Sequence, residues 1–351
     1  VARQGDTFFN IAKRYQTSAD AMMTANPNVD PANIQLGTKL VVPLAFEVVP
    51  TNVSWSYAIN TVVLDGLTAR YPFLRRETAG ASVMGKAIEA VSIGTGEKEV
   101  FYNASHHANE WITSPLVLAY LERYAAAYAG GGSIGGYDAK TLYADTTLFV
   151  MPLVNPDGVD LVTGALPSTD SYYRQAAVMA DFYPDIPFPS GWKANIAGVD
   201  LNLGYPAGWE MARTIKYAQG YTRPGPRDFV GSAPLAEPEN QAAYQFTKAH
   251  NFLLSISYHT QGKEIYWKYL DYDVPRAEEI ADAFAAASGY VPSETPYGSG
   301  FAGYKDWFIQ TYVRPGYTIE AGEGENPLPL SQFPAIYRDN EGIMTLGMAL
   351  S

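Results

Sequence analysis

The chain of 351 residues contains no cysteine, only four histidines, and no apolar run that approaches the ~20 residues of a membrane-spanning helix. Without cysteine there are no disulfides and no thiolate chemistry, so a metal site must use His, Asp or Glu. Positive charge is also scarce: 24 Lys and Arg stand against 36 Asp and Glu, for a net charge of −12. This balance argues against a nucleic-acid partner, because phosphate binding needs clustered cations.

The composition that remains is typical of a globular protein, with 47% hydrophobic and 17% charged residues. The length predicts about two domains. We expect a small unit over residues 1–44, a linker over 45–52 and a large domain over 53–351. No basic-then-apolar leader opens the chain, so we expect that any signal peptide has been removed or lies outside this sequence.

The first 44 residues show a β-α-α-β pattern. Thr7 and Ser18 are suited to cap two short helices, and Gly37 precedes a closing strand that ends at Pro43. With GDTFFNIAKRY, ANPN and IQLGTKLVVP in order, this unit resembles the LysM module. The resemblance implies binding to glycans that contain N-acetylglucosamine, such as peptidoglycan or chitin. The alternative is a small α+β packing domain without a ligand.

In the large domain, segments typical of buried strands alternate with amphipathic helices. The expected strands cover 87–93, 99–103, 148–154, 253–258, 264–268 and 317–320, and the clearest helices 64–71, 114–121 and 278–287. We expect a turn at residues 155–158, Asn-Pro-Asp-Gly. This alternation predicts a single α/β domain whose mixed, mostly parallel central sheet is flanked by helices. Residues 170–239 are rich in Pro, Gly and Tyr, and we expect them to be irregular and to wall a cleft.

A candidate metal site begins with His107 and Glu110, which directly follow a predicted strand and stand three residues apart. Such a pair alone is a weak signal. His259 follows a second predicted strand, and strand ends meet at one edge of an α/β sheet. Two histidines, one carboxylate and a water give the open coordination of a catalytic zinc. We therefore predict one Zn²⁺ per chain. His106 is the competitor for His107, and His250 is more typical of a cap or a surface residue.

The ligand pattern HxxE…H resembles that of the zinc metallocarboxypeptidase family, and the blocks NPDG (155–158), GVDLN (198–202) and YTIE (317–320) follow in the family's order. The resemblance implies a role for each matching residue. Glu320 would be the general base that takes a proton from the water that zinc activates, and Arg174 would stabilise the oxyanion. Asp200 would accept the other ring N–H of His107. Substrate would contact Asn202 and a mobile tyrosine, Tyr297 or its near neighbour Tyr304.

Plain structural roles remain open for two of these residues: Arg174 could pair with surface carboxylates, and Asp200 could cap a turn. Glu320 is harder to explain structurally, because an acidic residue that ends an apolar strand is costly unless it is paired or functional.

The sequence departs from an exopeptidase at two substrate positions. Leu203 and Asn109 stand where the exopeptidases carry arginines that bind the C-terminal carboxylate, and neither side chain can form that bidentate pair. The segment DLNLGYPAGW, residues 200–209, instead resembles the bacterial branch that cleaves γ-D-glutamyl–meso-diaminopimelate bonds in peptidoglycan stem peptides. With the LysM-like unit, this suggests a zinc endopeptidase that acts on the cell wall, outside the membrane.

Two alternatives stay open at this point. One is a zinc exocarboxypeptidase that takes its carboxylate clamp from another arginine, such as Arg213 or Arg223. The other, from a different class, is a wall-binding protein with an inactive peptidase-like domain.

Overall fold

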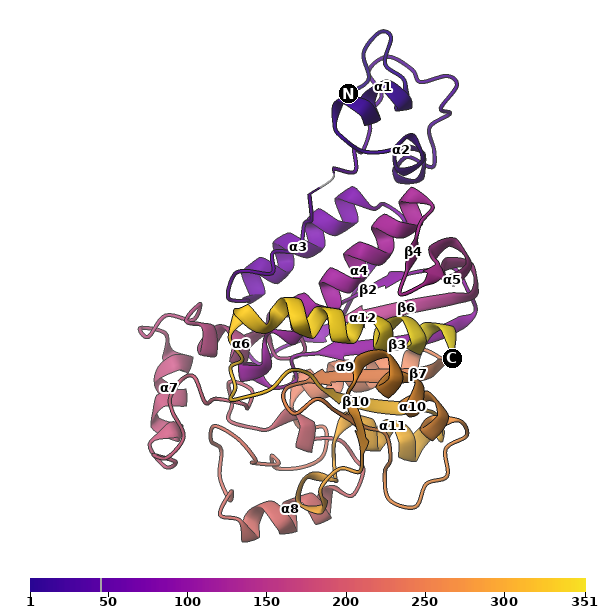
Figure 1. Ribbon diagram of the computed structural model, residues 1–351. Coiled ribbons are helices and arrows are strands. Elements are labelled where there is room, and N and C mark those ends of the chain that lie inside the picture. The colour runs from indigo at the N-terminus through magenta and orange to yellow at the C-terminus, as the bar shows by residue number, and fades with distance from the viewer. Residues whose placement is uncertain (45) are drawn as a thin grey trace.

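The computed structural model describes residues 1–44 and 46–351. A small N-terminal unit stands on one end of a much larger domain, whose central sheet is covered by helices (Figure 1). None of the helices among the described residues is both long and apolar enough to cross a membrane.

The N-terminal unit contains α1 (Phe8–Arg14) and α2 (Ala19–Ala25), as the sequence predicted. The hydroxyl of Thr7 accepts the Asn10 N–H at 3.1 Å, and that of Ser18 accepts the Ala21 N–H at 3.0 Å. The segments expected as strands form no regular ladder. Two backbone hydrogen bonds join Ala2 to Thr38 and Gly37, which holds the two ends side by side without a full strand pair.

The linker is anchored to the large domain. The Glu122 carboxylate on α4 accepts the N–H groups of Val48 and Val49 at 2.6 and 2.8 Å, and Arg70 lies 3.4 Å from the same carboxylate. Thr24 of α2 also donates to the Ala129 carbonyl at 3.3 Å. These contacts join Val48, Val49 and Thr24 of α2 to α4.

The central sheet has the order β1-β2-β6-β3-β7-β10-β8-β9. Strands β6, β3, β7 and β10 run parallel at its centre, while β2 and β8 join them in antiparallel pairs. The predicted mixed, mostly parallel sheet is therefore confirmed. The strand bounds are β1 Arg75–Ala81, β2 Ala87–Ile93, β3 Lys98–Ala104, β6 Thr146–Met151, β7 Phe252–His259, β8 Glu264–Tyr266, β9 Val291–Ser293 and β10 Gly316–Glu320, with a separate pair β4 Ser133–Ile134 and β5 Tyr137–Asp138.

Helices cover both faces of this sheet. On β3, Val100 and Tyr102 belong to one apolar cluster and Phe101 to the other, because successive side chains point to opposite faces. The first cluster includes residues of α3 (Tyr57–Arg70), α4 (Thr113–Gly130), α10 (Ala277–Ser288) and α12 (Phe333–Ala349); the second includes residues of α8 (Trp209–Ala218), α9 (Pro238–Ala249) and α11 (Tyr304–Tyr312). Helices α5 (Ala139–Asp145), α6 (Pro156–Thr163) and α7 (Ser171–Ala180), and the short helices η1 (Ala108–Glu110), η2 (Leu201–Leu203), η3 (Tyr297–Ser299) and η4 (Leu330–Gln332), complete the order.

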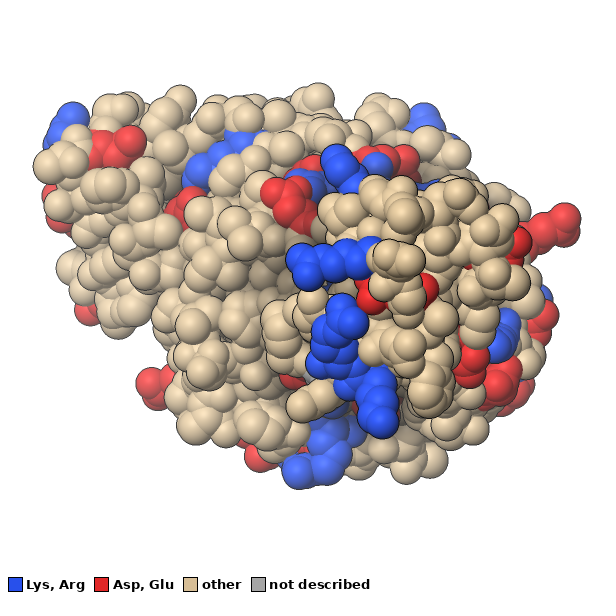
Figure 2. Space-filling view, turned by 90° about the horizontal axis from the view of Figure 1, so that it is seen from above, with Lys and Arg blue, Asp and Glu red and all other residues tan. Residues whose placement is uncertain are grey.

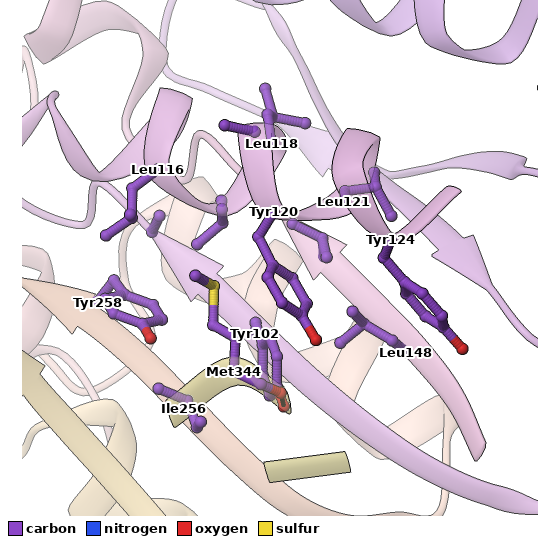
Figure 3. Close-up of a cluster of buried hydrophobic side chains, with 14 of the residues drawn as sticks. Tyr102, Leu116, Leu118, Tyr120, Leu121, Tyr124, Leu148, Ile256, Tyr258 and Met344 are labelled. Carbon is purple, nitrogen blue, oxygen red and sulfur yellow. Dashed lines mark hydrogen bonds between the residues drawn. The ribbon is translucent and has the colours of Figure 1, made fainter. Parts of the chain in front are cut away.

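The first cluster is rich in tyrosine. Figure 3 shows Tyr102, Tyr120 and Tyr258 between α4 and the sheet, among leucine side chains. The Tyr102 hydroxyl donates to the Met344 carbonyl of α12 at 2.6 Å, so this deep polar atom is satisfied. Each side chain of this size contributes roughly 1.5–3 kcal/mol when it is fully buried. The strands that position the site are thus fixed by a well-packed core.

Two segments differ from the sequence-based expectation. Residues 155–158, expected as a turn, begin α6, because the Asn155 side chain accepts the Gly158 N–H at 3.0 Å and Pro156 suits the first helical position. The region 170–239, expected to be irregular, contains α7 and α8. The long loops between these helices do form walls of cavities beside the sheet edge.

Candidate metal centre

The three predicted ligands lie together at one edge of the sheet. His107 and Glu110 belong to the turn after β3, and His259 is the last residue of β7. Strands β3 and β7 are parallel neighbours, with Ala104 opposite Tyr258. Their carboxyl ends therefore open on the same crevice, where α/β sheets place their sites. Candidate ligand atoms of the three residues all lie within 4.8 Å of one another.

The distances between the candidate ligand atoms suit a tetrahedrally coordinated cation. Nδ1 of His107 lies 2.9 Å from Glu110 Oε1, Nδ1 of His259 lies 2.9 Å from Glu110 Oε2, and the two nitrogens are 3.0 Å apart. All three side chains are buried. Zinc bonds of ~2.0–2.1 Å in a tetrahedron separate their ligands by about 3.3 Å, close to these distances. The donors thus surround the volume of one ion, and His107, Glu110 and His259 would hold it.

Asp200 lies beside His107, the first of the proposed ligands. Its Oδ1 lies 3.1 Å from Nε2 of His107, which leaves Nδ1 to face the other two ligands. Burial alone would raise the pKa of Asp200, but His107 and Lys193 hold that pKa well below its ordinary value. The carboxylate also caps η2 through the Asn202 N–H at 3.2 Å. The two roles proposed for Asp200, orienting partner and turn cap, therefore coexist.

The other two histidines, His106 and His250, are excluded as metal ligands by their positions. The ring of His106 is fully buried, and its Nε2 lies 3.0 Å from the Tyr205 hydroxyl. His250 lies after α9, 3.4 Å from the Glu99 carboxylate. Neither belongs to the group of potential ligands found in the described residues.

Glu320 ends β10 and stands in register with His259 on the neighbouring strand. It lines a cavity of about 180 Å³ together with His107, and a wider cavity of about 530 Å³ together with Glu110. Burial, with the negative charge of Glu110, raises the pKa of Glu320 to about 8. A bound dication would lower this pKa again, since it favours the charged carboxylate. The site therefore places a carboxyl group beside the triad, between the two cavities.

Arg174 does not lie where the resemblance placed it. It is exposed on α7, where its guanidinium donates to the Thr169 carbonyl and lines a different cavity, with Met179 and Ile196. Helix α7 projects from one side of the molecule (Figure 1). Arg174 lines neither of the two cavities that contain Glu320.

Lys193 is the cation that sequence reasoning missed. Its side chain lines both cavities that contain Glu320. Burial alone would lower the pKa of Lys193, but Asp200 and Glu110 raise it above its ordinary value, so the ammonium keeps its charge. The Lys193 carbonyl accepts the Ala108 N–H at 3.0 Å, which ties this loop to the turn that carries Glu110. Lys193 follows no predicted strand and stands five residues before the GVDLN block, a position that the sequence analysis did not consider.

The residues expected to contact substrate lie at different places in and around the crevice. Asn202 lines the smaller cavity and Asn109 the wider one. Leu203 is buried in the second apolar cluster. Tyr297 is 68% exposed at the start of η3, and its neighbours Pro296 and Ser299 line the smaller cavity. Tyr304 is fully buried and bonded to Thr247 at 2.8 Å, which excludes it as a mobile tyrosine.

A His-Glu-His centre at the carboxyl edge of a helix-covered sheet, beside a further carboxyl group, defines a metal-dependent hydrolase. Residues 61–341 match the zinc carboxypeptidase family, and residues 1–43 match the LysM domain. The chain belongs to the zinc carboxypeptidase family and is a metallopeptidase. That family depends on zinc, and the triad found here fits such a metal site.

Two relatives share much of the chain. It is 39% identical over 307 residues to gamma-D-glutamyl-L-diamino acid endopeptidase 1 of Lysinibacillus sphaericus, covering 88% of this chain and 75% of the relative. It is 37% identical over 277 residues to the uncharacterized protein YqgT of Bacillus subtilis (strain 168), covering 78% of this chain and 72% of that relative. The LysM match and this kinship point to an association with the cell wall.

Solved structures confirm the carboxypeptidase-like fold. Bovine thrombin-activatable fibrinolysis inhibitor superposes with a TM-score of 0.65 at 18% identity, covering 86% of this chain and 98% of that one. Carboxypeptidase A from Helicoverpa armigera gives 0.62 at 17% identity, covering 97% and 82%.

Proposed function

We propose that this protein hydrolyses the bond between γ-D-glutamate and meso-diaminopimelate in peptidoglycan stem peptides. The observation that carries the proposal is the absence of cationic side chains at the two positions that bind a C-terminal carboxylate in exopeptidases. Leu203 is packed in an apolar cluster, and Asn109 is a neutral amide in the wall of the wider cavity. The similarity to a relative named for gamma-D-glutamyl-L-diamino acid endopeptidase activity supports the same substrate.

The wider cavity offers a cation suited to the acyl side of this bond. Arg227 lines it and uses its Nε on Asp228 at 2.6 Å, which leaves other guanidinium N–H groups available. A γ-linked D-glutamyl residue keeps a free α-carboxylate next to the scissile carbonyl. Arg227 would bind that group. The alternative clamps of an exopeptidase, Arg213 and Arg223, line neither cavity and lie on aromatic rings instead.

The protein's own groups have separable tasks in this reaction. Zinc, one per chain, would supply Lewis-acid chemistry and lower the pKa of a water molecule to about 7. Glu320 accepts a proton from that water and later gives it to the leaving amine. Lys193 places a positive charge where the scissile oxygen becomes anionic. Asp200 keeps the His107 ring turned so that Nδ1 faces its partners.

The N-terminal unit would hold the enzyme on glycan strands. Binding through residues 1–44 raises the local concentration of stem peptide near the catalytic crevice. We propose that the protein is secreted and acts at the bacterial cell wall. Its substrate partners are therefore the glycan, through the LysM-like unit, and the stem peptide, through the large domain.

The test is a comparison of substrates with the purified holoenzyme. We expect cleavage of L-Ala-γ-D-Glu-meso-diaminopimelate peptides, also when the C-terminus is amidated, and much slower release of a C-terminal residue from an α-linked peptide. Faster turnover of the α-linked peptide would overturn the endopeptidase assignment. Loss of cleavage on amidation would favour the exocarboxypeptidase alternative.

A further inference from the structure

An ion pair with no role in the mechanism above forms part of the wall of the smaller cavity. Lys305 and Asp306 open α11 and line the cavity that also contains His107, Lys193 and Glu320. Nζ of Lys305 lies 2.6 Å from Oδ1 of Asp306, and their side chains are only 4% and 3% exposed. A buried ion pair often stabilises a fold no better than packed apolar residues would, so its presence beside a reaction site calls for a functional explanation.

Both charged groups keep unused hydrogen-bonding capacity. The Lys305 ammonium has three N–H donors, of which one goes to Asp306 and one to the Lys268 carbonyl at 2.7 Å. The Asp306 carboxylate has about four lone-pair sites, and it accepts from Lys305 and from the Gly303 N–H at 3.1 Å. The pair can therefore donate about one more hydrogen bond and accept about two.

The cavity extends from the reacting position toward this pair. Thr318 and Glu320 are two residues apart on β10, so their side chains share one face about 7 Å apart, and both line the cavity. The start of α11 is tied to the site because the Asn202 Oδ1 accepts the Tyr304 N–H at 3.0 Å. A side chain of several carbons that enters near Glu320 can thus extend toward Lys305 and Asp306.

The two cavities differ in a way that orients the substrate. The side that contains γ-D-glutamate continues through L-alanine to the glycan strand and needs the wider space of about 530 Å³. The side chain of the leaving residue has a free end and is not continued by further residues, so it fits the smaller space of about 180 Å³. Because Glu320 and Lys193 line both cavities, the scissile bond would lie where the two cavities meet.

We propose that Lys305 and Asp306 bind the distal end of diaminopimelate, which is itself an amino-acid zwitterion. Its carboxylate would accept from Lys305, and its ammonium would donate to Asp306. This inference rests on the proposed function and names the residues that select the leaving residue. The pair carries no net charge, so it suits a group that holds both charges. A lysine side chain would satisfy Asp306 alone and bring a second cation beside Lys305.

The first experiment varies only the leaving residue. Wild-type holoenzyme is given three γ-D-glutamyl peptides, with meso-diaminopimelate, L-lysine or L-norleucine after the scissile bond. We expect kcat/KM to be about 10–100-fold higher for meso-diaminopimelate than for L-norleucine, as two charge-assisted hydrogen bonds allow, with L-lysine also disfavoured. Equal rates within about threefold overturn the inference and leave the endopeptidase function intact. No cleavage of any of them overturns the proposed function itself.

The second experiment removes the pair. The double variant Lys305→Gln/Asp306→Asn deletes both charges and keeps the side-chain sizes, so it leaves no uncompensated buried charge. We expect the preference for meso-diaminopimelate to disappear while kcat/KM for the L-norleucine peptide stays within about threefold of wild type. Lys268→Gln, a partly exposed lysine of the neighbouring cavity, is the matched control. An unchanged preference in a folded double variant contradicts the inference; if this variant does not fold, the wild-type series decides.

Discussion

Three carboxylates within one crevice differ in chemistry because their neighbours differ. Glu110 faces two imidazoles; burial alone would raise its pKa, yet these partners hold the pKa well below its ordinary value. Asp200 has the same kind of partner on the far side of His107. Glu320 has no such partner, and burial raises its pKa to about 8. These environments suit the roles that we propose: metal ligand for Glu110, orienting group for Asp200 and proton carrier for Glu320.

The role of Glu320 is tested by Glu320→Gln. We expect kcat to fall on the order of 10²–10⁴-fold, because the amide cannot accept the proton of the attacking water. The zinc content should stay that of wild type, since Glu320 is not among the ligands. Glu323→Gln, an exposed glutamate three residues along, is the control and should keep wild-type activity. Near-normal turnover by Glu320→Gln would remove Glu320 from the mechanism.

Lys193 and Arg174 make opposite predictions for the oxyanion. We expect Lys193→Met to lower kcat on the order of 10²–10³-fold, with partial rescue in Lys193→Arg, because a preorganised cation stabilises charge that develops in the transition state. Arg174→Ala should leave steady-state kinetics unchanged. The reverse pattern would restore the role that the resemblance assigned to Arg174.

At this scale the three candidate ligands were singled out from the sequence, whereas Lys193, the cation that we propose for the oxyanion, was not. His107, Glu110 and His259 are recognisable because each follows an apolar strand, and strand ends in an α/β sheet converge. Lys193 reaches the crevice because of the route taken by a long loop, with backbone bonds such as the one from the Lys193 N–H to the Pro226 carbonyl at 2.7 Å. No local pattern encodes that route.

At the scale of elements, the site is formed at the carboxyl ends of three parallel strands. Strands β3, β7 and β10 lie side by side, and each contributes to the crevice at its carboxyl end. These strands were predictable because their apolar runs are buried. The helix predicted over 278–287 is likewise present, as α10. The segment 155–158 was misjudged because Asn-Pro-Asp-Gly suits both a turn and a helix start. Only the packing that follows decides between the two.

Helix α9 carries a buried carboxyl group, Glu239, that we expect to make stability depend on pH. Glu239 is fully buried, and its carboxylate accepts from the Val83 N–H at 3.0 Å and from Asn195 at 3.2 Å. Burial raises its pKa from 4.5 to about 7 despite these bonds. The folded state therefore keeps this proton at a pH where the unfolded chain has lost it. The stability linked to Glu239 is fully present below about pH 4.5 and is lost as the pH rises through 7.

We expect Glu239→Gln to abolish this part of the pH dependence. Between pH 4.5 and pH 8, the free energy of unfolding of wild type should fall by on the order of 2–3 kcal/mol more than that of the variant. Urea unfolding at both pH values measures the difference. Parallel losses in the two proteins would show that Glu239 has an ordinary pKa in the folded state.

At the scale of the whole molecule, a unit that matches the LysM domain is followed by a peptidase domain. The bonds from Val48 and Val49 to Glu122 fix the linker on α4. Figure 2, seen from above, shows a face on which uncharged residues prevail and a row of basic side chains runs down the middle, within a chain of net charge −12. We expect wall binding to depend on glycan contacts of the N-terminal unit.

Removal of residues 1–44 should separate the two activities. We expect a large loss of retention on purified cell walls, while kcat/KM for a soluble stem peptide stays within about threefold of wild type. Sedimentation with the walls measures retention, and the soluble assay shows that the large domain is still folded. Unchanged retention would assign wall binding to the large domain.

The most direct test of the central claim is the zinc content of the purified protein. We predict one zinc ion per chain in wild type and in the control His250→Gln, which changes a histidine outside the centre. Each of the substitutions His107→Gln, Glu110→Gln and His259→Gln should lower the stoichiometry to well below one and abolish peptide hydrolysis. Full zinc occupancy in a folded His259→Gln protein would contradict a centre built from these three side chains.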